Sequence, residues 1–263
     1  MKTLVLVKQV PNTDSPFRIN SAGTWVDESN LTYGLNNYDR YALEETLRLK
    51  DAGKATEVVA LTVGPERAAS ALRTCLATGA DRAVHIKDDA LGAADPLSVA
   101  RVIVAAIKDE GFSLILCGLQ ADDDNYMQIG PFVARLLDRP CATAAMSLEL
   151  REGTMRVERE LENNRLQIVD LTLPSVVTVQ TGINEPRYAS LKGIMAAKKK
   201  EIKVLALADL KLSASEIAAS EGRFRTVRLA TPPKGKGAEM LAGPADAIAK
   251  ELVKRIKEKT GVI

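Results

Sequence analysis

Short apolar runs separated by segments with helical character restrict the fold of this chain more than any other feature. The runs lie at residues 4–10, 58–63, 83–86 and 114–118, and we expect helices at 37–50, 65–78, 96–108 and 128–137. Continuous Val, Ile and Leu runs are typical of parallel strands covered on both faces. Strands and helices that alternate at this spacing predict an α/β fold with a doubly wound, mostly parallel sheet.

The pattern changes after Cys141. Residues 155–161 alternate apolar with charged side chains, and 166–171 are expected to pair back on them as a β-hairpin. We expect 176–179 to be the last buried strand and 191–200 to be a short helix.

The end of the chain is more polar and closes with an amphipathic helix expected at 244–259. We divide the chain into an α/β domain of residues 1–200, which includes a loop at 184–200, and an extended C-terminal arm of residues 201–263 that packs on a partner.

Charge and composition exclude several classes of function. Lys and Arg total 36 against 34 for Asp and Glu, so no basic surface for nucleic acid is predicted. His85 is the only histidine, which excludes a His-based metal centre, and its place in an apolar run favours a structural role over a catalytic one.

The cysteines and the apolar runs predict a cytoplasmic protein. Three scattered cysteines do not suit a disulfide framework, and no run approaches the ~20 apolar residues of a membrane span. The apolar N-terminus is expected to be the first strand and not a signal peptide.

Ligands of open α/β sheets bind at the carboxyl ends of the strands. Four such places stand out: residues 6–9, Asn36, residues 62–64 and the acidic turn at 118–130. A helix start at the end of that turn favours a phosphate, but three aspartates in a row repel one. We expect these aspartates to accept hydrogen bonds from ribose hydroxyls, to cap the helix or to help hold a metal ion. A solvated turn without a ligand is an equal alternative.

No Gly-x-Gly-x-x-Gly or P-loop motif is present, so neither an NAD site nor a Walker-type ATPase is indicated. The segment 184–200 carries an apolar stripe with a basic end. Such a segment is either an ordinary amphipathic helix or a docking element for a partner protein.

Several segments occur in the order found in one known family. They are VLVKQV at 5–10, LNNYDRYALEETLRLKD at 35–51, ALTVGP at 60–65, ATGADRAVHI at 77–86, VERELE at 157–162 and NEPRYASLKGIMAAKKK at 184–200. Over nearly its whole length the chain resembles the β subunit of electron-transfer flavoproteins, and the last segment is the most specific.

The resemblance implies an adenine-nucleotide α-hydrolase-like fold and a heterodimer whose α subunit carries FAD. It implies a structural AMP in this chain, or a second FAD at the same place in bifurcating members. The candidate cofactor-binding residues combine those at the carboxyl ends of the strands with those that match the nucleotide site of the family. They are Leu6, Val7, Lys8, Asn36, Asn37, Tyr38, Asp39, Thr62, Val63, Gly118, Gln120, Ala121, Asp122, Asp123, Asp124, Asn125, Met127, Gln128, Ile129 and Gly130.

The resemblance also implies docking residues. Leu191 is the anchor of a recognition loop at 187–196, and Glu160 matches an acidic residue that positions the α subunit. The partner-docking candidates are Glu160, Arg187, Tyr188, Leu191, Ile194 and Met195.

Three functions follow as hypotheses. In the leading one, FAD of the α subunit carries electrons from acyl-CoA dehydrogenase-type flavoproteins, as in fatty acid oxidation, to a quinone oxidoreductase, and this chain has no catalytic residue of its own. The alternative is a bifurcating complex in which FAD in this chain oxidises NADH. A free-standing adenine-nucleotide module is the third, although the docking segment and the arm speak against it.

Overall fold

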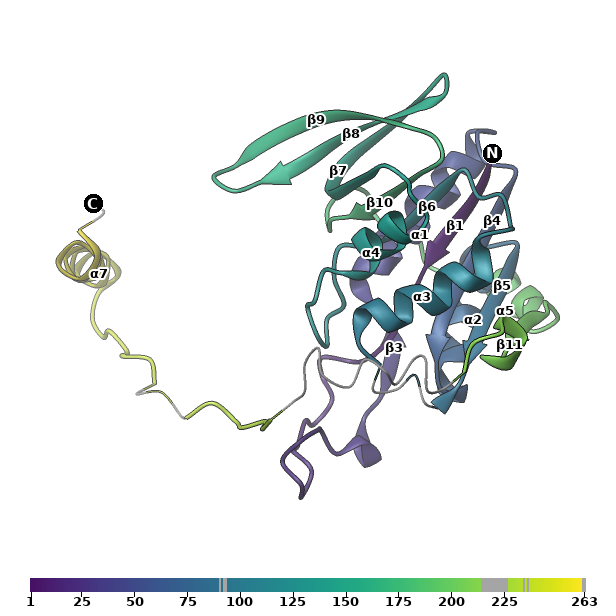
Figure 1. Cartoon of the computed structure of the whole chain (residues 1–263). Helices are drawn as coiled ribbons and strands as arrows, with labels where there is room; N and C mark the ends of the chain where they lie inside the picture. The colour runs from purple at the N-terminus through teal and green to yellow at the C-terminus, as the bar shows by residue number, and fades with distance from the viewer. Residues whose placement is uncertain (90, 92–93, 214–226, 234, 236, 262–263) are drawn as a thin grey trace.

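A nine-stranded sheet with helices on both faces forms the body of the chain (Figure 1). The computed structural model describes residues 1–89, 91, 94–213, 227–233, 235 and 237–261. The strand order is β11-β5-β4-β1-β6-β10-β7-β8-β9. The strands are β1 (Lys2–Leu6), β4 (Glu57–Gly64), β5 (Arg82–Lys87), β6 (Leu114–Gly118), β7 (Cys141–Arg151), β8 (Thr154–Leu161), β9 (Arg165–Thr172), β10 (Ser175–Val179) and β11 (Ile202–Leu205).

All pairings from β11 to β7 are parallel, and the pairings β7–β8 and β8–β9 are antiparallel. The expected doubly wound, mostly parallel α/β sheet is therefore confirmed. The β8–β9 hairpin is confirmed too, and its turn residues Asn163 and Asn164 have φ of 60° and 55°, a conformation that asparagine tolerates. The long strand β7 was not predicted.

Alternating side chains of the central strands divide the core into two layers. Val5 of β1 packs in the layer under α1 (Asn37–Asp51) and α2 (Ala69–Thr78), whereas Leu4 and Leu6 pack under α3 (Pro96–Ile107) and α4 (Ile129–Leu136). Because both faces are covered, these strands carry continuous apolar runs. The short 3-10 helices are η1 (Glu28–Asn30), η2 (Glu66–Ala68) and η4 (Ala208–Leu210).

Two boundaries differ from the expectation. The run at 4–10 is not one strand: β1 ends at Leu6, and β2 (Gln9–Pro11) pairs antiparallel with β3 (Tyr33–Leu35) outside the main sheet. Apolar periodicity does not show such a change of partner, because both pieces are buried.

The sheet also extends beyond residue 200, where we expected the arm to begin. Strand β11 pairs with β5 at the edge, and Leu207 after it is buried in the core. The signal was weak because the middle of this edge strand is exposed. The final helix is confirmed as α7 (Ala245–Thr260); none of its residues is buried, and Figure 1 shows it well apart from the sheet.

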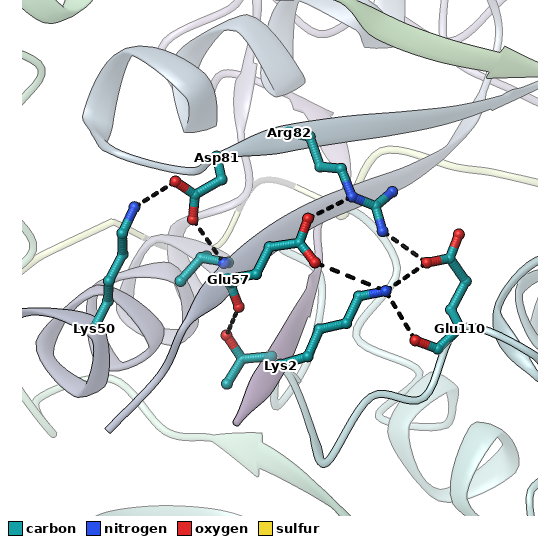
Figure 2. A network of polar contacts seen from close by, with 8 residues as sticks. Lys2, Lys50, Glu57, Asp81, Arg82 and Glu110 are labelled. Atoms are coloured by element: carbon teal, nitrogen blue, oxygen red, sulfur yellow. Dashed lines mark hydrogen bonds and ion pairs between the residues drawn. The ribbon is translucent and has the colours of Figure 1, made fainter. Parts of the chain in front are cut away.

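The amino ends of β1, β4 and β5 are joined by a charged network (Figure 2). Arg82 bonds Glu57 and Glu110 at 2.7 Å each, and Lys2 bonds Glu110 at 2.6 Å. These four side chains are each between 25% and 32% exposed. The network ties three strands together at the edge opposite the strands' carboxyl ends. In the part of the chain that the structure describes, no helix has the length and apolar character needed to cross a membrane.

Candidate nucleotide site and docking segment

Asn36 joins the start of α1 to the acidic turn after β6. Its side-chain amide donates to the carbonyl of Gln120 at 2.9 Å, and its Oδ1 accepts from the N–H of Asp122 at 3.0 Å. Asn36 is 1% exposed, so its amide is buried. A buried amide that satisfies two backbone groups of the turn holds that turn against the helix.

Asp39 makes a second connection one turn along α1. Its buried carboxylate accepts from the N–H of Lys8 at 2.8 Å and from the N–H of Gly118 at 2.9 Å. Burial raises the pKa of Asp39 to about 7, and the two backbone hydrogen bonds oppose that rise. One side chain thus joins the ends of β1 and β6 to the first helix.

The three consecutive aspartates have different partners. Lys8 Nζ lies 2.7 Å from Asp123 and 2.8 Å from Asp124, and Asp122 accepts from the N–H of Asn37 at 3.1 Å. Burial alone lowers the pKa of Lys8, but Asp123 and Asp124 outweigh it, so the pKa lies above its usual value. Asp122 therefore caps α1, not the helix that follows the turn, and Lys8 offsets part of the acidic charge that repels a phosphate.

Glycines at both ends of the turn allow close packing. A Cβ on Gly118 would lie 2.5 Å from Tyr38 Cβ and 2.5 Å from Asp39 Oδ1. A Cβ on Gly130 would collide with the side chain of Thr178. The acidic turn is therefore pressed against α1, and α4 begins directly against the sheet.

The start of α4 leaves backbone donors available. No side chain in the described part of the chain caps its first turn, and the preceding residues Tyr126, Met127 and Gln128 are exposed. The first N–H groups of a helix have no acceptor within the helix. Asn125 and Met127 have φ of 53° and 57°, a left-handed conformation that turns the chain sharply before the helix.

The remaining candidate residues differ in burial and in their hydrogen bonds. Leu6, Val7 and Thr62 are buried, and the Thr62 hydroxyl donates to the carbonyl of Val7 at 2.7 Å. The side chains of Leu6 and Val7 belong to the hydrophobic core, and the role of all three residues in binding a cofactor stays a prediction. The side-chain amide of Gln120 donates to the Tyr38 hydroxyl at 3.1 Å. Val63, Ala121 and Ile129 are half-buried.

Taken together, these groups fit an adenine nucleotide. The N–H groups of Ile129 and Gly130 at the start of α4 suit a phosphate. The carboxylates of Asp122 and Asp123 accept from Asn37 and Lys8 and keep further lone pairs for ribose hydroxyls. Half-buried Val63 and exposed Met127 are apolar neighbours for a base. Among the described residues, no group of His, Cys, Asp and Glu is arranged to hold a metal ion. His85 is 1% exposed, with Nε2 3.1 Å from the carbonyl of Gly64, as a structural role requires.

The docking segment, which we define as residues 184–200, presents apolar side chains to solvent. Ser190 caps its helix α5 (Leu191–Ala197), because the Ser190 hydroxyl accepts from the N–H of Gly193 at 3.0 Å. The exposed fractions are 89% for Tyr188, 78% for Leu191, 57% for Met195 and 43% for Ile194. The four expected apolar docking residues are thus exposed, and their role in docking stays a prediction.

The two charged docking candidates lie apart from one another. Glu160 is on β8, exposed, and accepts from the side-chain amide of Gln180 at 2.9 Å. Arg187 pairs within the chain, with Nε 2.8 Å from Glu44 Oε2. Sequence reasoning missed Glu44, which is buried on α1. Its spacing of three residues from both Tyr41 and Leu47 indicates the packed face of that helix.

Comparisons with known proteins agree with this arrangement. A model of the electron transfer flavoprotein domain matches residues 23–210. The chain is 39% identical to electron transfer flavoprotein subunit beta of Methylophilus methylotrophus, over 99% of this chain and 100% of that protein. The subunit beta of Bacillus subtilis is 38% identical over 100% of both chains, and that of Bos taurus is 34% identical over 98% of this chain and 97% of its own.

Proposed function

The chain belongs to the electron transfer flavoprotein family as a β subunit, and from this premise we propose that it forms a heterodimer with an α subunit and binds AMP. In this proposal the electron-carrying FAD belongs to the α subunit. AMP has no redox-active group, so its contribution in this chain is structural.

The observation that carries the AMP proposal is the joining of three segments by Asn36 and Asp39 beside the start of α4. The site lies at the carboxyl ends of β1 and β6, where open α/β sheets bind ligands. The N–H groups of Ile129 and Gly130 in the first turn of α4 hold the phosphate, and Asp122 and Asp123 orient the ribose. Asn36 and Asp39 keep the turn in place from behind.

The proposal assigns electron transfer to the complex as a whole. The exposed side chains of Tyr188, Leu191 and Met195 dock acyl-CoA dehydrogenase-type flavoproteins, and the exposed Lys192, Lys198 and Lys199 attract an acidic partner. The FAD of the α subunit then passes electrons to a quinone oxidoreductase. This chain supplies binding surfaces and no catalytic residue.

The experiment is to measure nucleotides in the complex co-purified with its α subunit, released by denaturation and quantified by chromatography. We expect one FAD and one AMP for each heterodimer. Two FAD and no AMP would contradict the AMP assignment and support the bifurcating alternative, with NADH as the substrate to test next. A heterodimer with one FAD and no second nucleotide would contradict nucleotide binding by this chain.

A further inference from the structure

Hydrogen bonds and an ion pair hold the docking segment against the rest of the chain on both sides of its exposed apolar residues. On the C-terminal side, Arg73 of α2 donates to the carbonyl of Ala197 at 2.7 Å, and Lys200 Nζ donates to the carbonyl of Ala80 at 2.6 Å. On the N-terminal side the fastening is made by Arg187 and Glu44. Tyr188 and Leu191 lie between the two attachments.

The geometry of the Arg187–Glu44 pair is that of a specific contact. Nε and Nη2 of Arg187 lie 2.8 Å and 2.9 Å from the two oxygens of Glu44, and the backbone N–H of Arg187 donates to Oε2 at 3.1 Å. The Glu44 side chain is only 7% exposed, against 37% for Arg187. A bidentate pair with one buried partner fixes orientation in a way that an exposed ion pair does not.

Apolar packing beneath this part of the docking segment is incomplete. A pocket of about 230 Å³ lies between α1, α2 and residues 186–188, and Arg187 and Tyr188 are among its lining residues. Because this space is not filled by side chains, the path of residues 187–190 depends on polar contacts. Asn184 adds two of them, to the carbonyl of Tyr41 at 3.0 Å and to Glu45 at 3.1 Å.

We propose that Arg187 and Glu44 are positioning residues for partner docking: the pair sets the path of residues 187–190 and thereby the orientation of Tyr188 and Leu191. Arg187 acts through Glu44 and not by touching the partner. This inference rests on the docking function proposed above and changes the role expected for Arg187 from contact residue to positioning residue.

The first test uses the heterodimer as electron acceptor of an acyl-CoA dehydrogenase-type flavoprotein. Arg187→Lys keeps the charge but loses the bidentate geometry, and Glu44→Gln keeps the shape but loses the charge. We expect each to raise KM for the heterodimer about tenfold, with kcat and FAD content unchanged, a change equivalent to ~1.4 kcal/mol. Nη2 of Arg187 also lies 2.7 Å from Asp51 Oδ2, a contact that only Arg187→Lys disturbs. The double variant should therefore show no greater increase than Arg187→Lys alone, because the two substitutions share the Arg187–Glu44 interaction.

Arg151→Gln is the control, because Arg151 forms an exposed ion pair with Glu149 on β7, 2.8 Å apart and outside the docking segment. Its KM should equal that of the native complex. If Arg187→Lys and Glu44→Gln both kept a native KM, positioning by this pair would be refuted. If Glu44→Gln alone kept a native KM, Arg187 would act by direct contact with the partner, which also overturns the proposal.

Hydrogen exchange of the heterodimer without the dehydrogenase separates the two proposals. The amides of residues 188–194 should exchange faster in Arg187→Lys and Glu44→Gln, and at the native rate in Leu191→Ala. Native exchange in both pair variants would overturn the positioning role. A native KM for Leu191→Ala would instead contradict the docking function, while the exchange data would still report on the pair.

Discussion

The backbone N–H of Gly118 donates a hydrogen bond to the buried carboxylate of Asp39, with 2.9 Å between the nitrogen and Oδ1. The other oxygen accepts from the N–H of Lys8 at 2.8 Å. Gly118 ends β6, and Asp39 lies in the first turn of α1. One side chain therefore holds two strand ends and a helix start in register at the edge of the sheet where we propose that AMP binds.

Asp39→Ala should loosen this edge, because it leaves the N–H groups of Lys8 and Gly118, which are both half-buried residues, without their acceptor. We expect amide exchange at Lys8 and Gly118 to be faster and the AMP content of the purified heterodimer to be lower. Asp246→Ala is the control, since Asp246 is exposed on α7. If Asp39→Ala kept the native AMP content, nucleotide binding would not depend on this carboxylate.

The pH dependence of stability should carry the signature of Asp39. Burial raises its pKa from 3.8 to about 7, so between these values the folded state binds a proton that the unfolded state has released. Stability contributed by this group therefore falls as pH rises from 4 to 7 and is constant above 7. Between pH 4 and 7 the free energy of unfolding of the native protein should fall by up to about 4 kcal/mol more than that of Asp39→Asn. Denaturant unfolding at several pH values measures this difference. If the free energies of unfolding of the two proteins changed equally with pH, the prediction would be contradicted.

Gly118→Ala should disturb the same place sterically. The added Cβ would lie 2.5 Å from Tyr38 Cβ and 2.5 Å from Asp39 Oδ1, so the turn must move away from α1. We expect a loss of about 1–3 kcal/mol in the free energy of unfolding, as for other overpacked sites, together with reduced AMP content. In Gly235→Ala a Cβ meets nothing within 4 Å, so both measurements should stay native.

Leu191→Ala should weaken docking without affecting the cofactors. The side chain is 78% exposed, so the free heterodimer loses little stability when it is shortened. We expect a slower electron transfer rate from the partner dehydrogenase at low heterodimer concentration, with FAD and AMP content unchanged. Val204→Ala, at an exposed apolar position on edge strand β11, is the matched control. Equal electron transfer rates in the two variants would show that Leu191 does not take part in docking.

Arg82→Gln should affect stability but not nucleotide binding. Arg82 joins Glu57 and Glu110 at the amino ends of the strands (Figure 2), on the opposite edge from the proposed AMP site. Hydrogen bonds from Lys2 and then Arg82 hold the pKa of Glu110 below its usual value, so the network loses its stabilising effect as pH falls through that lowered pKa. We expect a loss of about 1 kcal/mol at neutral pH that shrinks with added salt. An equal loss at every salt concentration would point to packing and not to charge.

Much of the fold was predictable because it depends on local patterns. The apolar run at 58–63 and the proline before 97–107 specify a buried strand and a helix without knowledge of distant residues. The change of partner after Leu6 and the edge strand β11 were missed, because burial of β2 and exposure of β11 depend on neighbours far along the chain.

For the candidate site, the strand pattern was enough to predict which segments meet, since the carboxyl ends of parallel strands lie at one edge of the sheet. The role of each side chain there became clear from the folded chain. The structure assigned Asp122 to cap α1, Asp123 and Asp124 to Lys8, and Arg187 to Glu44. The physical reason is that periodicity encodes which face of a segment is buried, whereas the partner of a charged side chain is set by distances between segments that come together only in the folded chain.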